Sequence, residues 1–365
     1  MSKIYKIVIT GGPCAGKSSS LDIIKKHYEN RDIKVVTLFE TATDLINQGI
    51  APWNCKTPLE FQRIRIKKQI EREKEIYEYV KTLNNDKIII LFDRGLLDSL
   101  AYTEKKDFEN ILKENNLNII SARDEYDAVF HMMSVSKGHS DFYTLDNNQA
   151  RIESVSEAKL LDDKIISSWV GHPHFRIIPS FNTFEEKVDN LIKEIDLIIN
   201  DNQLEIERKY LIELDNIDLL INNKYCEKVN ITQTYLNIDE NQEIRVRKRG
   251  IRNNFIYYHT VKKYISDLKR EEIENKITEE EYYKLLNSYS NVTQIKKDRY
   301  CLVYKNQYLE IDIYPFWNNQ AILEVELSAE NKNVCIPDYI KIIKEVTNEK
   351  EFKNSFLAKK YGDLI

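Results

Sequence analysis

The chain has 365 residues and a formal net charge of −5 at pH 7, with 42% hydrophobic and 31% charged residues. This length predicts two domains, and the slightly acidic balance argues against a basic nucleic-acid-binding module. No apolar run approaches the roughly 20 residues that span a bilayer, and five scattered cysteines without a signal-peptide pattern favour the reducing cytoplasm.

Predicted strands and helices alternate in the first half of the chain. Apolar runs predict strands at 4–9, 33–39, 87–92, 127–132 and 175–178. The stretches between them predict helices from near Gly16 and over 58–83, 106–116, 153–169 and 183–199. This order predicts an α/β domain over residues 1–198, with a parallel sheet covered on both faces.

The loop after the first strand reads Gly11-Gly-Pro-Cys-Ala-Gly-Lys-Ser18 and fits G-x-x-x-x-G-K-[ST]. In this motif glycines let backbone N–H groups approach phosphate oxygens, the lysine reaches the outer phosphates, and the serine binds magnesium. A chance turn is the alternative, but a strand precedes the loop and a helix follows it. The pattern predicts binding of ATP or GTP with Mg²⁺, through residues Gly11, Gly12, Gly16, Lys17, Ser18 and Ser19.

Further charged residues follow other strands of this half. Asp93 ends the strand at 87–92, where a carboxylate could enter the magnesium shell or accept a proton, and Arg94 could stabilise the transferred phosphoryl group. A helix-capping aspartate with a surface arginine is the alternative. Glu40 is a similar candidate, and Arg151 follows a loop where nucleotide kinases often carry a lid.

The first half also resembles a known P-loop family. This family groups the kinase domain of the bacterial nicotinamide-riboside kinase/adenylyltransferase with the TRPL translocation defect protein of animals. The matching segments are Gly11–Ser19, Glu40-Thr-Ala-Thr43, Phe92-Asp-Arg-Gly95 and Tyr126-Asp-Ala-Val129. The resemblance implies nucleotide binding and leaves the acceptor of the phosphoryl group open, as it does the choice between ATP and GTP.

Residues 203–365 predict a second domain of short antiparallel strands, with brief helices at 214–222, 278–288 and 337–345. Its strands repeat pairs of charged residues two positions apart, which places each pair on one face of a strand. The pairs are Glu205/Glu207 with Lys209, Arg245/Arg247, Thr260/Lys262, Arg270/Glu272/Glu274, Lys297/Arg299, Glu310/Asp312 and Glu324/Glu326.

The paired charges have two interpretations. For any single strand, a solvated polar face is the simpler explanation. The segregation of acidic from basic pairs favours a charged cavity inside a barrel of about eight strands. Paired carboxylates suit Mg²⁺ or Mn²⁺, and grouped arginine and lysine side chains suit phosphate oxygens, so the cavity would take a triphosphate with bound metal.

Residues 204–365 resemble a CYTH domain, the triphosphate tunnel metalloenzyme family. The signature Glu-x-Glu-x-Lys is Glu205, Glu207 and Lys209, and the chain ends the pattern with Leu323-Glu-Val-Glu326. The resemblance implies an eight-stranded tunnel-like barrel. The implied metal ligands are Glu205, Glu207, Glu310, Asp312, Glu324 and Glu326; the implied triphosphate ligands are Lys209, Arg245, Arg247, Lys262, Lys297 and Arg299, with Arg270 as a further candidate.

Together these features predict a bifunctional cytoplasmic enzyme, a P-loop kinase-like domain joined to a metal-dependent triphosphatase. Glu205, Glu207, Lys209 and Arg299 would carry catalysis in the second domain, and Asp93 in the first. The alternative is a nucleotide-gated binding or trafficking protein that holds a phosphorylated ligand or phospholipid without turnover. A cyclase and an RNA 5′-end-processing enzyme are weaker alternatives, since neither an adenine-reading feature nor an aromatic-basic surface motif is present.

Overall fold

The computed structural model describes residues 2–137, 154–200, 206–238, 242–264, 270–329 and 331–364. The description excludes the side chains at 264, 270–272 and 364. The chain forms two compact units, Met1–Ile198 and Ile199–Ile365. None of the helices within the described ranges is both long and apolar enough to cross a membrane.

The first unit is built on a parallel sheet with the strand order β2-β3-β1-β4-β5. The strands are β1 (Lys3–Thr10), β2 (Lys34–Leu38), β3 (Lys87–Asp93), β4 (Ala128–Met132) and β5 (Phe175–Ile178). Nearly every residue of β3 and β4 is buried, as expected for strands that are covered on both faces. Parallel pairing brings the carboxyl ends of β1, β3 and β4 to one edge, because Ile9 pairs with Asp93 and Thr10 with His131.

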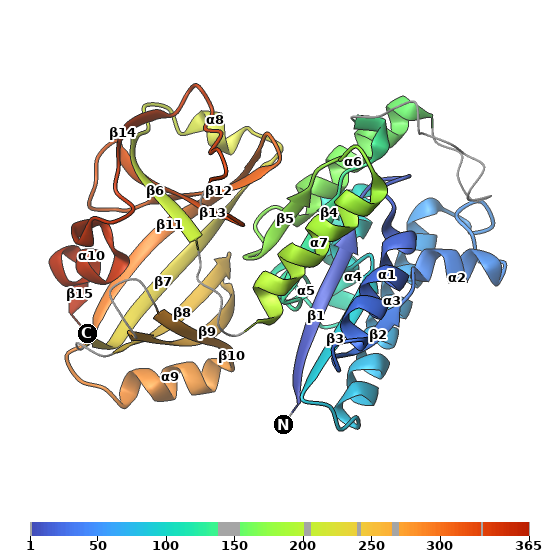
Figure 1. The fold of residues 1–365 in the computed structure, drawn as a ribbon, viewed down its shortest axis with the longest axis horizontal. Helices are drawn as coiled ribbons and strands as arrows, with labels where there is room; N and C mark the ends of the chain where they lie inside the picture. Colours follow the sequence, from blue (N-terminus) through green and yellow to red (C-terminus); the bar gives the residue numbers. More distant parts are fainter. Residues whose placement is uncertain are drawn as a thin grey trace. The chain divides into compact units, whose positions relative to one another are not determined.

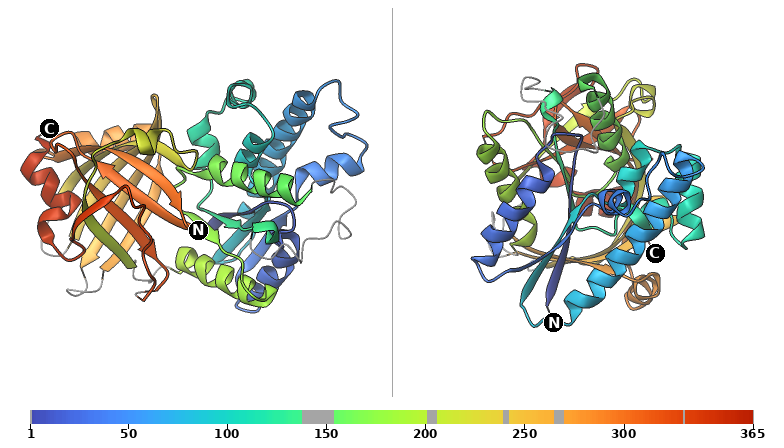
Figure 2. Two further views of the ribbon diagram at one scale, coloured as in Figure 1. Left: turned by 90° about the horizontal axis from the view of Figure 1, so that it is seen from above. Right: turned by 90° about the vertical axis from the view of Figure 1, so that its right-hand side faces the viewer.

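Helices cover both faces of this sheet, with α1 and α7 on one face and α3 to α6 on the other (Figures 1 and 2). Their bounds are α1 (Lys17–Glu29), α2 (Thr41–Asn47), α3 (Pro58–Lys81), α4 (Lys105–Glu114), α5 (Ile119–Arg123), α6 (Val155–Trp169) and α7 (Phe184–Ile199), with 3-10 turns η1 (Leu96–Ala101) and η2 (Val135–Lys137). The long helix α3 begins where Thr57 accepts a hydrogen bond from the backbone of Glu60 and Pro58 opens the first turn. The predicted α/β fold is confirmed.

The second unit is a strongly curved antiparallel sheet (Figure 1). Its strand order is β10-β9-β8-β7-β11-β12-β13-β6-β14, and β15 pairs with β11. The bounds are β6 (Ile206–Glu213), β7 (Cys226–Ile238), β8 (Gln242–Ile251), β9 (Asn254–Tyr264), β10 (Arg270–Ile277), β11 (Thr293–Tyr304), β12 (Gln307–Ile313), β13 (Gln320–Leu327), β14 (Lys341–Glu345) and β15 (Asp363–Leu364). The predicted eight-stranded antiparallel, tunnel-like fold is confirmed in β6 to β13, to which the two short strands β14 and β15 are added.

One face of this sheet carries apolar side chains, and these are covered by other parts of the unit. Tyr210, Leu323 and Val325 belong to one buried cluster, and Ile340 next to β14 packs on it. Val246 and Tyr257 belong to a second cluster with Tyr282 of α9. The short helices are α8 (Asp218–Ile221), α9 (Glu279–Asn287) and α10 (Asn354–Tyr361), with the 3-10 turn η4 (Lys350–Phe352).

Several local predictions were wrong or incomplete. The predicted helix at 337–345 is instead a loop followed by the edge strand β14, which pairs with β6 through Ile342 and Ile212. Its β-branched isoleucines suit a strand, and the open edge of β6 supplies the hydrogen-bonding partner. Sequence analysis also did not identify the short helices α2, α5 and α10, which lack a long periodic pattern.

Candidate functional site

The phosphate-loop motif lies between β1 and α1 and follows a path that requires glycine at two positions. Gly11 has a φ of 142°, and a Cβ there would lie 2.2 Å from the Met132 carbonyl oxygen. Gly16 has a φ of 86°, and a Cβ there would lie 2.6 Å from the Phe184 ring. Both the dihedral angles and the close contacts exclude other residues. The loop therefore turns tightly into the amino end of α1, as phosphate binding by backbone N–H groups requires.

Lys17 rests on neutral partners in this loop. Its Nζ donates hydrogen bonds to the carbonyl oxygens of Gly11 at 2.9 Å and Gly12 at 3.0 Å. Burial and then the nearby Arg94 lower the pKa of Lys17 to about 8, and Asp93 and Glu40 partly oppose them. No carboxylate neutralises the ammonium directly in these contacts, so an arriving phosphate would gain a charged partner.

Ser18 and Asp93 form a pair of oxygen ligands beside this loop. The Ser18 hydroxyl donates to Asp93 Oδ2 at 3.1 Å. Asp93 is buried, and its other carboxylate oxygen, Oδ1, has no hydrogen-bond partner in the part of the chain that the structure describes. Burial raises the pKa of Asp93, although Lys17 opposes that shift. A buried carboxylate oxygen without a partner beside a serine hydroxyl fits Mg²⁺, which prefers oxygen ligands.

Arg94 links the end of β3 to Glu40. Its backbone is left-handed, with a φ of 72°, and its Nε donates to Glu40 Oε1 at 2.6 Å. Its Nη1 lies 3.6 Å from Asp98 Oδ1, which is longer than a hydrogen bond. Burial alone would raise the pKa of Glu40, but Arg94 and Lys17 hold it below its ordinary value. Glu40 therefore stays ionised close to the phosphate loop and could accept a proton from a hydroxyl.

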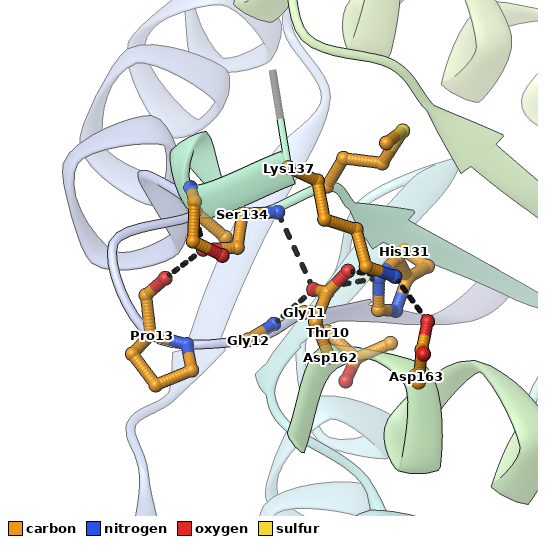
Figure 3. A network of polar contacts seen from close by, with 12 residues as sticks. Thr10, Gly11, Gly12, Pro13, His131, Ser134, Lys137, Asp162 and Asp163 are labelled. Carbon is orange, nitrogen blue, oxygen red and sulfur yellow. Dashed lines mark hydrogen bonds and ion pairs between the residues drawn. The ribbon is translucent and has the colours of Figure 1, made fainter. Parts of the chain in front are cut away.

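Side chains that sequence analysis missed brace the phosphate loop from outside (Figure 3). Asp162 of α6 is fully buried, and its Oδ1 accepts from the backbone of Gly12 at 2.8 Å and of Ser134 at 3.3 Å. His131 Nε2 lies 3.0 Å from the same oxygen, and Lys137 Nζ lies 2.8 Å from Oδ2. A Cβ at Gly12 would lie 2.7 Å from Asp162 Oδ1, so the carboxylate fits closely against the loop.

Two further contacts complete this brace. Ser134 donates to the carbonyl oxygen of Pro13 at 2.5 Å, and Lys187 donates to that of Ala15 at 2.9 Å. Burial lowers the pKa of Lys187 to about 8. We name Ser134, Asp162 and Lys187 the loop brace. No motif identifies these residues, because each lies in a segment whose sequence is that of an ordinary strand end or amphipathic helix.

In the second unit, strand registers place the predicted charged pairs on one face of the curved sheet. Lys209 lies opposite Glu324, which lies opposite Glu310, and Arg299 lies opposite Asp312. The same face continues across β7, β8 and β9 through Gln233, Tyr235, Arg245, Arg247, Thr260 and Lys262. Most of these side chains are buried or half-buried. The charged face is therefore enclosed, and the interpretation as a solvated face is wrong for the central strands.

A single guanidinium lies at the centre of this face. Arg299 Nε and Nη2 donate to the two oxygens of Asp312, each at 2.7 Å, and Nη2 also donates to Glu324 Oε2 at 2.7 Å. Its Nη1 donates to Glu310. We name Arg299, Glu310, Asp312 and Glu324 the arginine cluster. Three of the six predicted metal ligands thus contact one side chain.

Two lysines extend the arginine cluster. Lys297 contacts Asp312, and Lys209 Nζ lies 2.9 Å from Glu324 Oε1 and 3.2 Å from Glu207 Oε1. Lys297 and Asp312 are buried, with 5% and 0% of their surface exposed. A buried carboxylate between two cations is retained only because each charge is paired.

The electrostatics of the arginine cluster follow from burial and mutual attraction. Burial opposes the charge on Arg299, but Asp312 and Glu310 raise its pKa well above the ordinary value. Burial raises the pKa of Glu310 despite Arg299, whereas Lys209 and Arg299 overcome burial and lower that of Glu324. Burial also lowers the pKa of Lys297. Among these carboxylates, Glu310 is thus the one whose proton affinity is raised, which favours it as a general base.

Arg247 of β8 is less completely hydrogen-bonded than Arg299. Its Nη2 donates to Glu274 Oε1 at 2.7 Å, but its buried Nε has no hydrogen-bond partner among the described residues. On the same strand, Arg245 Nη1 lies 3.6 Å from Glu243 Oε1. Lys262 of β9 lies opposite Glu243. A buried guanidinium N–H without a partner is a site where an anion oxygen would be stabilised.

The remaining predicted residues lie at the edges of these sites or outside the description. Ser19 is exposed on α1, and Glu326 is exposed on β13 opposite Glu207. Glu205 and Arg151 are outside the described residues, and Arg270 opens β10 with a side chain that is not described. Among the side chains that are described, no three His, Cys, Asp or Glu residues are grouped so as to hold a metal ion.

Comparison with known proteins finds one family model that matches part of the chain. Residues 6–187 match the AAA domain family. No curated protein matches the chain. The solved structure of the inorganic triphosphatase NE1496 is 25% identical, with a TM-score of 0.31, and the match covers 43% of this chain and 95% of that one. The PH1012 protein from Pyrococcus horikoshii OT3 is 21% identical, with a TM-score of 0.28, and the match covers 34% and 80%.

Proposed function

We propose that this protein handles phosphoanhydrides at two separate sites. The first unit binds ATP or GTP with Mg²⁺ and transfers or hydrolyses the γ-phosphoryl group. The second unit hydrolyses a triphosphate, such as tripolyphosphate, a nucleoside triphosphate or thiamine triphosphate, with a divalent metal. The observation that carries the second assignment is the burial of Lys297, Arg299, Asp312 and Glu324 on one enclosed face, because buried charges with perturbed pKa values concentrate at functional sites.

In the first unit, the chain's own groups supply binding and charge stabilisation. Backbone N–H groups of the loop would cradle the phosphates, while Lys17 exchanges its carbonyl partners for phosphate oxygens. Ser18 and Asp93 would hold the magnesium ion, which offsets charge on the phosphates when bound. Glu40 would accept the proton of an attacking hydroxyl or water, and Arg94 both orients Glu40 and offsets the developing charge.

In the second unit, phosphate oxygens would be bound by the basic side chains of β6, β8, β9 and β11, which are Lys209, Arg245, Arg247, Lys262 and Lys297. The acidic residues would hold the divalent metal, which offsets charge on the phosphates when bound. A water molecule would attack the terminal phosphorus while a carboxylate accepts a proton from that water. The P–O bond between the terminal phosphoryl group and the remaining phosphates would then break. Arg299 and Lys297 offset the charge on the leaving phosphate.

A binding protein without turnover is the second candidate function. One observation favours it: the acidic side chains contact arginine and lysine, as in a lattice of structural ion pairs. In that case the P-loop unit would respond to nucleotide, while the second unit would hold a phosphorylated ligand or phospholipid.

Phosphate release separates these functions. Wild type should be assayed with tripolyphosphate, ATP, GTP and thiamine triphosphate, with Mg²⁺ and with Mn²⁺. We expect phosphate release from the substrate of the second unit to depend on metal. The double variant Glu205→Ala with Glu207→Ala should reduce this release at least 100-fold, and Lys17→Ala should leave it unchanged. Release that is unchanged in the double variant would exclude the tunnel assignment, and stable ligand binding without release would favour the binding protein.

A further inference from the structure

The arginine cluster presents a conflict between the cation that the protein supplies and the cation that a triphosphatase would recruit. Arg299 donates four hydrogen bonds to Glu310, Asp312 and Glu324, three of them at 2.7 Å. Those oxygens are the ones that a divalent metal would need. Within the described residues, no carboxylate trio is grouped for metal binding. As they lie here, these residues fit a guanidinium and not a metal ion.

The two cations cannot share these oxygens. A metal ion about 2 Å from the same carboxylate oxygens would lie within about 5 Å of the guanidinium nitrogens. At that separation, like charges repel by several kcal/mol even at an effective dielectric constant near 20. The guanidinium must therefore move away before a metal can bind, and it gains a new partner only where another anion is present.

Of the three cations in and beside the arginine cluster, Arg299 is the one that a metal ion would replace. Lys297 also contacts Asn354 Oδ1 at 3.2 Å, so α10 holds it independently of the carboxylates. Lys209 lies at the β6 edge of the cluster, where its ion pairs with the described residues are to Glu324 and Glu207. Arg299 alone contacts all three carboxylates, and its planar fork suits a phosphate as well as a carboxylate.

We propose that Arg299 and the divalent metal exclude one another on Glu310, Asp312 and Glu324. Without ligand, the guanidinium occupies the place of the metal. Triphosphate draws it away, and the freed carboxylates then bind metal. This inference rests on the proposed triphosphate function of the second unit. Metal and triphosphate should therefore each strengthen the binding of the other, because coupling between two ligands is reciprocal.

Metal binding in the absence of phosphate tests the exchange. Full-length wild type and Arg299→Gln are titrated with Mn²⁺, with free Mn²⁺ followed by electron paramagnetic resonance and no nucleotide present. We expect Arg299→Gln to bind Mn²⁺ at least tenfold more tightly than wild type. The matched control is Arg208→Gln on β6, which removes a guanidinium from an exposed pair with Glu345 and should leave Mn²⁺ affinity unchanged.

A second variant covers the case in which Arg299→Gln does not fold. Arg299→Lys keeps the charge but cannot contact three carboxylates at once, so it should bind Mn²⁺ a few-fold more tightly than wild type. Mn²⁺ affinity that is unchanged or weakened in the folded variants overturns the exchange. If wild type shows metal-dependent phosphate release while these affinities do not move, the exchange alone fails; if wild type shows no such release, the proposed function fails.

Discussion

The two units hold their phosphate-binding cations in opposite ways. Lys17 in the first unit donates hydrogen bonds to backbone carbonyl oxygens, at 2.9 and 3.0 Å, on a loop that is braced from outside. Arg299 in the second unit contacts three carboxylates. A cation on neutral oxygens is ready for an anion, whereas a cation on carboxylates must first be released. The first site is therefore preorganised by its backbone, and the second by a lattice of charges.

The difference also sets what each unit loses when one residue is removed. The site in the first unit depends on the shape of the phosphate loop. Residues that do not touch the ligand, such as Asp162, hold that shape. The arginine cluster depends on mutual neutralisation of its charges, so removing any one member leaves the others buried with fewer partners of opposite charge. The following changes test this contrast in order of expected effect.

Removal of Asp312 should be the most damaging single change. Asp312→Ala leaves Lys297 and Arg299 buried with reduced compensation, which should lower the free energy of unfolding of the second unit by about 3–5 kcal/mol. The control is Asp298→Ala on the neighbouring strand β11, where Asp298 pairs with the exposed Lys228, and this change should cost less than about 1 kcal/mol. Thermal unfolding of both variants measures this. Equal losses of stability in the two variants would show that the buried arginine cluster contributes no more than an exposed ion pair.

Disruption of the loop brace should affect nucleotide binding more than stability. Asp162→Asn removes the charge that binds the Gly12 backbone, His131 and Lys137, and should weaken binding of ATP with Mg²⁺ about tenfold, at a cost of about 1–3 kcal/mol in stability. Asp163→Asn is the matched control, because Asp163 is the neighbouring partner of the same Lys137 and does not contact the loop in the hydrogen bonds described.

Calorimetric titration with a non-hydrolysable ATP analogue measures this effect. Affinity reduced equally by both substitutions would assign the effect to Lys137. Unchanged affinity in Asp162→Asn would show that the phosphate loop keeps its shape without the brace.

A half-buried acid in the first unit, Glu73, should give a smaller, pH-dependent effect. Burial raises the pKa of Glu73 from 4.5 to about 7, although Gln69 and Tyr126 donate to it. The folded state then binds its proton more tightly than the unfolded state, so stability is lost as pH rises from about 4.5 to about 7. Glu73→Gln should stabilise the unit by about 1–2 kcal/mol at pH 8 and by little at pH 5.

Denaturant unfolding at these two pH values checks this prediction. Exposed Glu75 on the same helix provides the control substitution Glu75→Gln, which should show no such pH dependence. A stabilisation of the same size at both pH values would exclude ionisation of Glu73 as its cause.

The sequence predicted those parts of the molecule that depend on local pattern. The phosphate loop was identifiable because glycines, Lys17 and Ser18 are adjacent in the chain, and the strand alternation around Glu310 and Asp312 identified which side chains share a face. Asp162 and Lys187 were not identifiable, because their partners lie 150 and 172 positions away in the chain. The arrangement of three carboxylates around Arg299 was also beyond sequence analysis, since the register and curvature of the sheet decide which charges meet.

The central claim is that the second unit binds a triphosphate independently of the phosphate loop. Calorimetric titration of the Lys17→Ala variant with imidotriphosphate and Mg²⁺ tests it most directly. We predict one bound equivalent, and loss of that binding when Arg245→Ala and Arg247→Ala are added on the same background. Absence of binding to Lys17→Ala, or binding that survives the removal of both arginines, would contradict the account.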